Sequence, residues 1–178
     1  GLRSILRQDP DVIFVGEIRD AETAQTDVQA ALTGHLVIST VHTNSALAAA
    51  ARLTDLGVEP FLLSDVLKAL IGQRLVRRVC TNCATDDPDS NDHESKAISL
   101  LPAPMRAATP QWRVGQGCPT CGGAEYHGRN GVFETVRVTP ALQHAIRERA
   151  PEHELIALAR KDGFTSLLEN GLAQSREG

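Results

Sequence analysis

The sequence predicts an α/β fold that is built on a parallel sheet and ends in a small helical part. Three observations predict it. Two apolar runs rich in β-branched residues flank a helical pattern, two C-x-x-C pairs lie further along the chain, and a third strand pattern leads into three helical segments. With 178 residues, 42% of them hydrophobic, the chain is long enough for one domain of ordinary size or two small ones.

The first predicted unit is a strand, a helix and a second strand. Residues 11–15 (DVIFV) and 36–41 (LVISTV) are continuous apolar runs, which are typical of strands buried on both faces of a parallel sheet. Between them, Asp20 is placed to cap a helix whose apolar residues recur at helical spacing until Gly34. The three elements form a βαβ unit, whose crossover makes the two strands parallel.

Two more helices are predicted after the second strand. One covers residues 46–55 and is closed by Gly57. The next starts after Pro60, because proline suits the first position of a helix. It carries apolar side chains along one side, namely Phe61, Leu62, Val66, Leu67 and Leu70.

The last third of the chain predicts one strand and three helices. Residues 130–139 (NGVFETVRVT) alternate as a strand does, with one face formed by Val132, Glu134, Val136 and Val138. Helical segments follow at about 140–149, 152–162 and 165–175, the first with Thr139 as its cap and Pro140 at its first position.

The middle section differs in composition. From Cys80 to Cys121 it is rich in Pro, Asp, Ser, Asn and Thr, and it contains the acidic run DDPDSNDHE at 86–94. Such a composition buries too little apolar surface to become ordered by packing alone. This section therefore needs another source of order.

The four cysteines of the chain lie at the ends of that section, as the pairs Cys80 and Cys83, and Cys118 and Cys121. Each C-x-x-C pair can offer two thiolates to one ion, and two pairs complete a tetrahedral Zn²⁺ shell. We predict a zinc site, and its role is structural because protein supplies all four ligands. A redox dithiol and simple structural thiols are the alternatives, and His93 and His127 are candidate substitute ligands.

Charge and composition argue against two classes of function. A net charge of -4 with 3% aromatic residues is unlike a nucleic-acid-binding surface, which needs a basic face and stacking rings. No run approaches the roughly 18 apolar residues of a membrane span, and no signal segment stands at the start. We expect a soluble, intracellular chain that binds no nucleic acid; a zinc-ribbon nucleic-acid protein is the disfavoured alternative. Since the sequence does not begin with Met, we expect a fragment of a longer protein.

A carboxylate follows the first predicted strand. Glu17 lies just past the carboxyl end of residues 11–15, where ligands collect in open α/β sheets. A carboxylate there can coordinate Mg²⁺ through water or orient a water toward a phosphoryl group. The alternative is that Glu17 pairs with Arg19 or caps the next helix.

Four segments, in order, resemble the secretion ATPase superfamily, the hexameric motors of type II secretion and of type IV pili. They are DPDVIFVGEIRDAETA at 9–24, TGHLVISTVHTNSA at 33–46, GVEPFLLSDVLKALIGQRLVRRVC at 57–80 and GCPTCGGAEYHGRNGVFETV at 117–136. The first two are similar to the Walker B and His-box segments, and the last two flank and contain the tetracysteine subdomain. The resemblance covers nearly the whole chain and is strongest to the type II secretion ATPases, with the pilus-assembly ATPases next.

The resemblance implies an architecture with three parts. Residues 1–79 are the C-terminal part of a RecA-like P-loop ATPase domain, residues 80–121 an inserted Cys₄ zinc subdomain, and residues 122–178 a strand with a small helical C-terminal subdomain.

The resemblance also implies roles for individual residues. Glu17 matches the Walker B glutamate, which positions the hydrolytic water and Mg²⁺, and His35 and His42 match the His box, which senses the terminal phosphate. The same motif contains its supporting residues Gly16, Arg19 and Asp20. For each histidine the alternative is a structural helix-end or core residue.

The partners and cofactors implied by the resemblance belong to the full-length protein. They are ATP and Mg²⁺, five further copies in a homohexamer, and inner-membrane secretion platform proteins that hold a cytoplasmic motor at the membrane indirectly. The chain has no G-x-x-x-x-G-K-[ST] phosphate loop. We therefore expect the isolated chain neither to hydrolyse ATP nor to bind it tightly.

Two further interpretations are compatible with the sequence. In isolation the chain could act as a zinc-stabilised docking module without chemistry of its own. Arg74, Arg77 and Arg78 could line a subunit interface or reach an acidic partner, although a solvated charged face is the commoner explanation of such a run.

Overall fold

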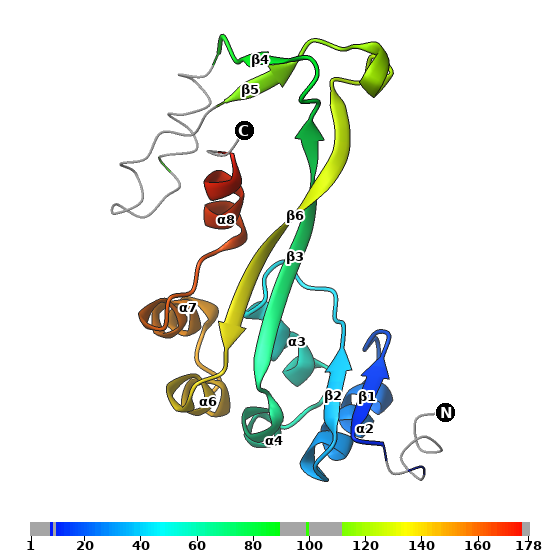
Figure 1. The fold of residues 1–178 in the computed structure, drawn as a ribbon. Helices are drawn as coiled ribbons and strands as arrows, with labels where there is room; N and C mark the ends of the chain where they lie inside the picture. Colours follow the sequence, from blue (N-terminus) through cyan, green and yellow to red (C-terminus); the bar gives the residue numbers. More distant parts are fainter. Residues whose placement is uncertain (1–7, 9, 90–98, 100–111, 176–178) are drawn as a thin grey trace. The chain divides into compact units, whose positions relative to one another are not determined.

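The computed structural model describes residues 8, 10–89, 99 and 112–175 (Figure 1). The chain divides into two compact units. The first comprises Gly1–Ile71 and Thr135–Phe164, and the second comprises Gly72–Glu134 and Thr165–Gly178. The boundaries expected at residues 79 and 121 remain a prediction.

The first unit contains the predicted βαβ element. Strand β1 (Val12–Val15) pairs in parallel with β2 (Leu36–Ser39), and helix α2 (Ala21–Leu32) connects them. The helix starts where expected, because the Asp20 carboxylate accepts a hydrogen bond of 2.8 Å from the Thr23 backbone N–H. The prediction of a parallel strand pair with a crossover helix is therefore confirmed. The expected burial of both faces of these strands is wrong, because Phe14 of β1 and Leu36 of β2 are 71% and 52% exposed.

Two short helices follow, and the second one is shorter than predicted. Helix α3 spans Ala48–Asp55 and α4 spans Pro60–Val66. The expected continuation of α4 to Leu70 is wrong, because Leu67 turns to an extended backbone with ψ of 121° and strand β3 (Ala69–Val79) begins two residues later. Leu70 is nevertheless buried, from the strand rather than from the helix.

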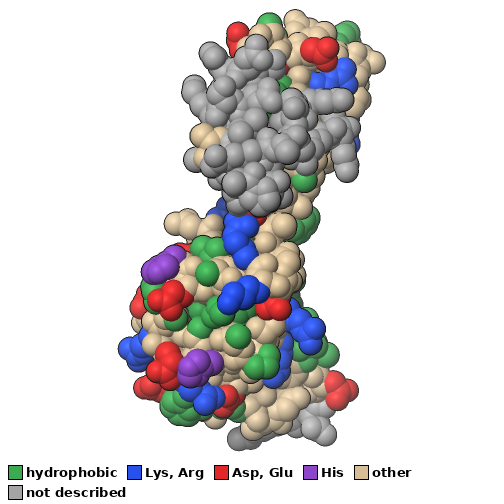
Figure 2. Space-filling view, turned by 90° about the vertical axis from the view of Figure 1, so that its left-hand side faces the viewer, with side chains coloured by type: hydrophobic (Ala, Val, Ile, Leu, Met, Phe, Trp, Pro, Cys, Tyr) green, Lys and Arg blue, Asp and Glu red, His purple; other side chains and the backbone are tan. Residues whose placement is uncertain are grey.

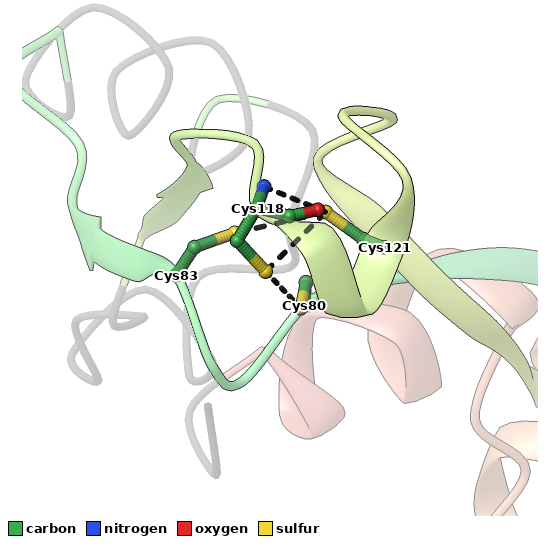
Figure 3. A group of neighbouring side chains, drawn as sticks. All are labelled: Cys80, Cys83, Cys118 and Cys121. Carbon is green, nitrogen blue, oxygen red and sulfur yellow. Dashed lines mark hydrogen bonds between the residues drawn. The ribbon is translucent and has the colours of Figure 1, made fainter.

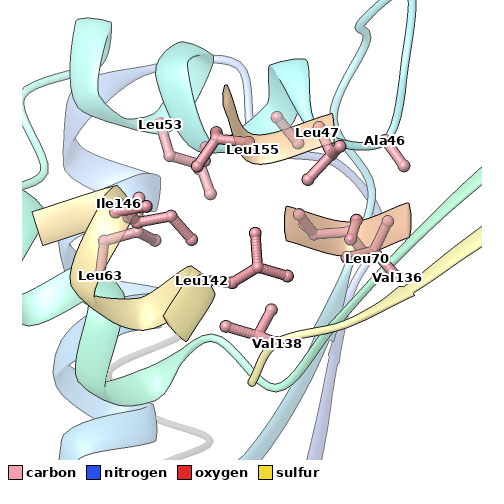
Figure 4. Packing of buried hydrophobic residues seen from close by; sticks show 14 of the residues in the cluster. Ala46, Leu47, Leu53, Leu63, Leu70, Val136, Val138, Leu142, Ile146 and Leu155 are labelled. Carbon is pink, nitrogen blue, oxygen red and sulfur yellow. The ribbon is translucent and has the colours of Figure 1, made fainter. Parts of the chain in front are cut away.

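The core of the first unit joins its N-terminal elements to helices α6 (Pro140–Arg147) and α7 (Glu152–Lys161) (Figure 4). Leu63 of α4 and Leu142 of α6 are each 1% exposed. A fully buried leucine contributes roughly 1.5–3 kcal/mol of hydrophobic stabilisation. Residues 135–164 are therefore part of the unit that contains β1 and β2.

Strands β3 and β6 (Tyr126–Arg137) pair with each other and run in opposite directions (Figure 1). The direction follows from backbone hydrogen bonds at the two ends, from Val138 N–H to Lys68 O at 2.9 Å and from Cys80 N–H to Glu125 O at 2.9 Å. The predicted buried face of β6 is confirmed, since Val132, Glu134 and Val136 are each at most 4% exposed.

The second unit contains the buried carboxylate of Glu134. Its Oε2 accepts a 3.1 Å hydrogen bond from the backbone N–H of Leu167, the first residue of helix α8 (Leu167–Gln174). Gly72 of β3 passes so close that a Cβ there would lie 2.7 Å from Glu134 Cγ. Glycine is thus required on β3 for the glutamate to reach the helix.

Among its described residues, the second unit also contains a two-stranded sheet and a turn. Strands β4 (Ala84–Asp86) and β5 (Arg113–Gly115) are antiparallel, and the 3₁₀ turn η3 (Pro119–Cys121) follows. Part of the acidic run at 86–94, including His93, lies outside the described residues.

Among the residues that the structure describes, no helix is long and apolar enough to cross a membrane. On the face that Figure 2 shows, basic, acidic and hydrophobic side chains are interspersed over the described surface. A mixed surface of this kind does not steer ligands of one charge class toward that face.

Candidate functional site

Glu17 lies in the turn after β1, and two other predicted site residues contact it. Its carboxylate accepts hydrogen bonds from Arg19, with Nη2 to Oε2 at 2.5 Å and Nε to Oε2 at 2.6 Å. The other oxygen, Oε1, is 3.1 Å from His42 Nε2. The Glu17 side chain is 19% exposed, whereas that of His42 is 89% exposed. The structure therefore brings together one carboxylate, one guanidinium and one imidazole at the carboxyl end of the parallel strands.

Thr40 was not among the predicted site residues, but it fixes the backbone around Glu17. Its carbonyl oxygen accepts from the Ile18 backbone N–H at 2.8 Å, and its Oγ1 donates to the Gly16 carbonyl oxygen at 2.6 Å. The residues on both sides of Glu17 are thus bound to one residue after β2. Its position in the sequence could have indicated this role. Thr40 follows the second strand of a parallel pair, so it lies beside the end of the first strand.

The charges at this site act on each other. The hydrogen bond from Arg19 is the main cause that lowers the pKa of Glu17, and the nearby His42 lowers it further. The same contact raises the pKa of Arg19. A carboxylate of low pKa stays ionised at neutral pH and accepts hydrogen bonds, so it suits the orientation of a water or a cation shell better than strong proton abstraction.

His35 is not brought to Glu17. Its Nδ1 lies 2.9 Å from the Ala30 carbonyl oxygen and 3.1 Å from Thr33 Oγ1, at the C-terminal end of α2. A hydrogen bond to Ala30 requires the tautomer with its proton on Nδ1. This is the helix-end position that was the alternative for each histidine, and its phosphate-sensing role stays a prediction.

Asp20 has a structural position at the other end of the same helix. Both of its carboxylate oxygens contact Thr23, Oδ1 accepting from the backbone and Oδ2 from the side chain, and these bonds lower the pKa of Asp20. Asp20 therefore fixes the start of α2, directly after the turn that carries Glu17.

The four cysteines form one cluster in the second unit (Figure 3). Their Sγ atoms all lie within 4.8 Å of one another. Three separations are 3.8 Å (Cys80 to Cys118), 3.9 Å (Cys83 to Cys121) and 3.7 Å (Cys118 to Cys121). A regular tetrahedron with Zn–S bonds of about 2.3 Å has S–S edges of roughly 3.8 Å. The cluster therefore has the dimensions of a Cys₄ zinc shell.

The surroundings of the cluster lower the pKa of one cysteine and raise that of another. The Asn82 side-chain amide, 3.5 Å from Cys118 Sγ, is the main cause that lowers the pKa of Cys118 to about 5. Burial raises the pKa of Cys83 to about 11. Metal ligation requires thiolate, so a cation is what would allow all four sulfurs to ionise together. His127 is not a member of this cluster among the described residues.

The arginines of β3 make local contacts. The Arg77 guanidinium lies 3.8 Å from the centroid of the Tyr126 ring, and Arg78 Nε donates to the His127 carbonyl oxygen at 3.2 Å. These contacts cross from β3 to β6. A role for Arg74, Arg77 or Arg78 at a subunit interface stays a prediction.

Comparison with known proteins gives a match over the whole chain. Residues 1–178 match the family model described as type II/IV secretion system protein. The type II secretion system protein E of Klebsiella pneumoniae is 50% identical over 165 residues, covering 93% of this chain and 32% of that protein. The type II secretion system ATPase E of Vibrio cholerae is 46% identical over 178 residues, covering 100% and 34%.

A pilus protein is also among the similar relatives. The type IV pilus assembly ATPase PilB of Thermus thermophilus is 44% identical over 180 residues, covering 99% of this chain and 20% of the relative. The chain thus spans about a third or less of the length of these curated relatives.

Solved structures share the fold. The pilus retraction motor PilT with bound ADP is 27% identical with a TM-score of 0.59, covering 95% of this chain and 41% of that chain. The ATPase DotB of Legionella pneumophila is 20% identical with a TM-score of 0.63, covering 100% and 38%, which shows likeness of fold alone. Both neighbours support the predicted RecA-like α/β class.

Proposed function

This chain belongs to the type II/IV secretion system protein family, and from that premise we propose that it is the C-terminal part of an ATP-hydrolysing motor of type II secretion. The observation that carries the proposal is the Glu17 carboxylate at the end of β1, held by Arg19 and His42. The chain resembles type II secretion proteins E at 46–50% identity, and one of them is named an ATPase. In the full-length protein, residues 1–79 would complete a RecA-like domain.

Glu17 is proposed to orient the water that attacks the terminal phosphate. When bound, ATP with Mg²⁺ supplies the phosphoryl group and the cation that neutralises its charge. Arg19 keeps the carboxylate ionised and fixes the direction of its oxygens, and Thr40 fixes the backbone on both sides. His42 contacts Oε1 through Nε2 and is 89% exposed, so its other ring nitrogen can donate a hydrogen bond to a phosphate oxygen. Gly16, Asp20 and His35 would support this arrangement from the turn and from the ends of α2.

The cysteine cluster is proposed to hold structural zinc. The S–S separations fit a tetrahedral shell, and four protein ligands would leave no open position for a substrate. The ion would join the two ends of residues 80–121. The remainder, residues 122–178, would supply β6 and the C-terminal helices.

The assembly and the location are proposed from the family. The full-length motor would be a homohexamer in the cytoplasm, attached to the inner membrane only through secretion platform proteins, and it would not use nucleic acid. Type IV pilus assembly is a second candidate, because the Thermus thermophilus relative at 44% identity is a pilus assembly ATPase. As an isolated piece, the chain would be a zinc-stabilised docking module.

ATP turnover by two purified proteins tests the proposal. The full-length protein that carries these residues should hydrolyse ATP with Mg²⁺, whereas the 178-residue chain should not, since it contains no phosphate loop. Hydrolysis by the short chain, or none by the full-length protein in hexameric form, would contradict the proposal.

A further inference from the structure

The loop that carries His42 is held at both of its ends. At its start, Thr40 bonds to Gly16 and Ile18 beside Glu17. At its end, Ser45 makes two hydrogen bonds through one hydroxyl group. Its Oγ accepts from the Ala48 backbone N–H at 3.1 Å and donates to Oε1 of Glu152 in a short hydrogen bond. The exposed His42 therefore lies between two fixed points.

The second fixed point comes from a distant part of the sequence. Glu152 is the first residue of α7 and stands 107 positions after Ser45. The contact lies beside the core of the first unit. Ala46 and Leu47, which follow Ser45, and Leu155, one turn after Glu152, are each at most 5% exposed, and Figure 4 shows Leu47 and Leu155 pointing into the same packed region. Packing of their neighbours thus keeps Ser45 and Glu152 within hydrogen-bond distance of each other.

We propose that Glu152 is a positioning residue for the proposed ATP hydrolysis, acting through Ser45 on the loop that presents His42 to Glu17. This inference rests on the proposed function. Because Ser45 donates its single proton to Glu152, a lone pair of the same oxygen is left to accept the hydrogen bond from the Ala48 backbone N–H. Loss of the carboxylate frees the hydroxyl to rotate and releases the end of the loop, and positioning errors of this kind reduce turnover.

Variants of Glu152 can separate the loss of the hydrogen-bond acceptor from the loss of the charge. Glu152→Gln keeps a side-chain oxygen that can accept from Ser45 and loses the charge, whereas Glu152→Ala loses the acceptor. Glu154→Ala is the matched control, because Glu154 lies in the same first turn and is also exposed. The double variant Ser45→Ala with Glu152→Ala completes a cycle: if the two residues act as one unit, the double variant is no worse than Ser45→Ala alone.

Two measurements test the inference. On the 178-residue chain, amide hydrogen exchange of residues 40–47 should become about threefold to tenfold faster in Glu152→Ala, and should stay near the unaltered chain in Glu152→Gln and Glu154→Ala. In the full-length protein, Glu152→Ala should lower kcat by about threefold to tenfold with the KM for ATP unchanged, and Glu152→Gln should restore most of it.

The outcomes separate the inference from the proposed function. The positioning role is supported if Glu152→Ala shows faster exchange and a lower kcat, and Glu152→Gln restores most of the kcat. Unchanged exchange in Glu152→Ala overturns it, and so does faster exchange with unchanged kcat. A kcat loss that Glu152→Gln does not rescue, or that Glu154→Ala reproduces, also overturns it. If the full-length protein with native Glu152 does not hydrolyse ATP, the proposed function fails, and the exchange data alone then show whether the contact holds the loop.

Discussion

His42 Nε2 lies 3.1 Å from Glu17 Oε1, so the loops that follow the two parallel strands meet at one carboxylate. Arg19 contacts the other oxygen of the same carboxylate. Each contact is partly exposed and adds little to stability by itself, since exposed ion pairs contribute on the order of 0–1 kcal/mol. Their significance is geometric, because together they fix the direction in which Glu17 presents its charge.

Replacement of Arg19 should change the titration of Glu17. The hydrogen bond from Arg19 is the main cause of the lowered pKa of Glu17, so Arg19→Ala should raise that pKa toward its ordinary value of 4.5. A carboxyl group whose pKa is lowered on folding favours the folded state above its unfolded pKa, and this contribution is lost as the pH falls through the folded pKa. Carbon-detected NMR titration of the Glu17 carboxyl measures the change, and Arg52→Ala on α3 is the control. If the Glu17 carboxyl titrates in Arg19→Ala as it does in the unaltered protein, Arg19 is not the cause of the lowered pKa.

Removal of metal should destabilise the second unit. Protein purified without chelator should contain close to one zinc per chain, and Cys80→Ser or a strong chelator should lower its melting temperature by more than about 10 °C. Thr120→Ala, which lies between two of the ligands, is a matched control that leaves every sulfur in place. Protein without zinc and with four reactive thiols, at an unchanged melting temperature, would refute the Cys₄ site.

Asp27 should make the stability of the first unit depend on pH. Its side chain is 4% exposed, neither oxygen has a hydrogen-bond partner among the described residues, and burial raises its pKa to about 6. A carboxyl group whose pKa is raised on folding lowers stability as the pH rises from its unfolded pKa to its folded pKa. Asp27→Asn should therefore have little effect at pH 4 and should stabilise the chain by up to about 3 kcal/mol at pH 8. Urea unfolding at the two pH values measures this.

The comparison for that experiment is Asp11→Asn, since Asp11 is an exposed aspartate of the same unit. The same stability gain at pH 4 and pH 8 would show that Asp27 does not titrate as its burial implies.

One face of the parallel strand pair should cause self-association of the isolated chain. The register places Val12 beside Leu36 and Phe14 beside Ile38, and all four side chains are 48–71% exposed on the same face. Contiguous exposed apolar surface of this kind promotes association. Sedimentation over a range of concentrations should show oligomers that Phe14→Ser reduces. Phe61→Ser, at a similarly exposed phenylalanine on α4, should not reduce them.

The parts of the fold that local patterns determine were predictable. Asp20 capped α2, the β-branched runs became parallel strands, and the face of β6 alternated as expected. Strand β3 was missed, because Leu67 and Leu70 continue the helical spacing of α4, while pairing with β6, 50 or more residues away along most of its length, decides the conformation. Long-range pairing is the information that a local pattern does not contain.

The candidate site was predictable in its chemical groups and less so in its geometry. Glu17, Arg19 and His42 come together, but His35 remains at the end of α2, bonded to Ala30. Thr40 was missed because a threonine after a strand is common, and its two backbone contacts depend on the neighbouring turn. Nothing in the sequence around Glu134 indicated that its carboxylate accepts a hydrogen bond from the Leu167 backbone N–H.

The most direct test of the proposed function is ATP turnover by the full-length protein with Glu17→Gln. Glutamine keeps the size of the side chain and removes the charge, so nucleotide binding and assembly should persist while kcat falls by about 10²–10⁴-fold. Glu22→Gln, an exposed glutamate in the first turn of α2, should retain full turnover. Turnover by Glu17→Gln within a factor of about three of the protein with native Glu17 would contradict a catalytic role for this carboxylate.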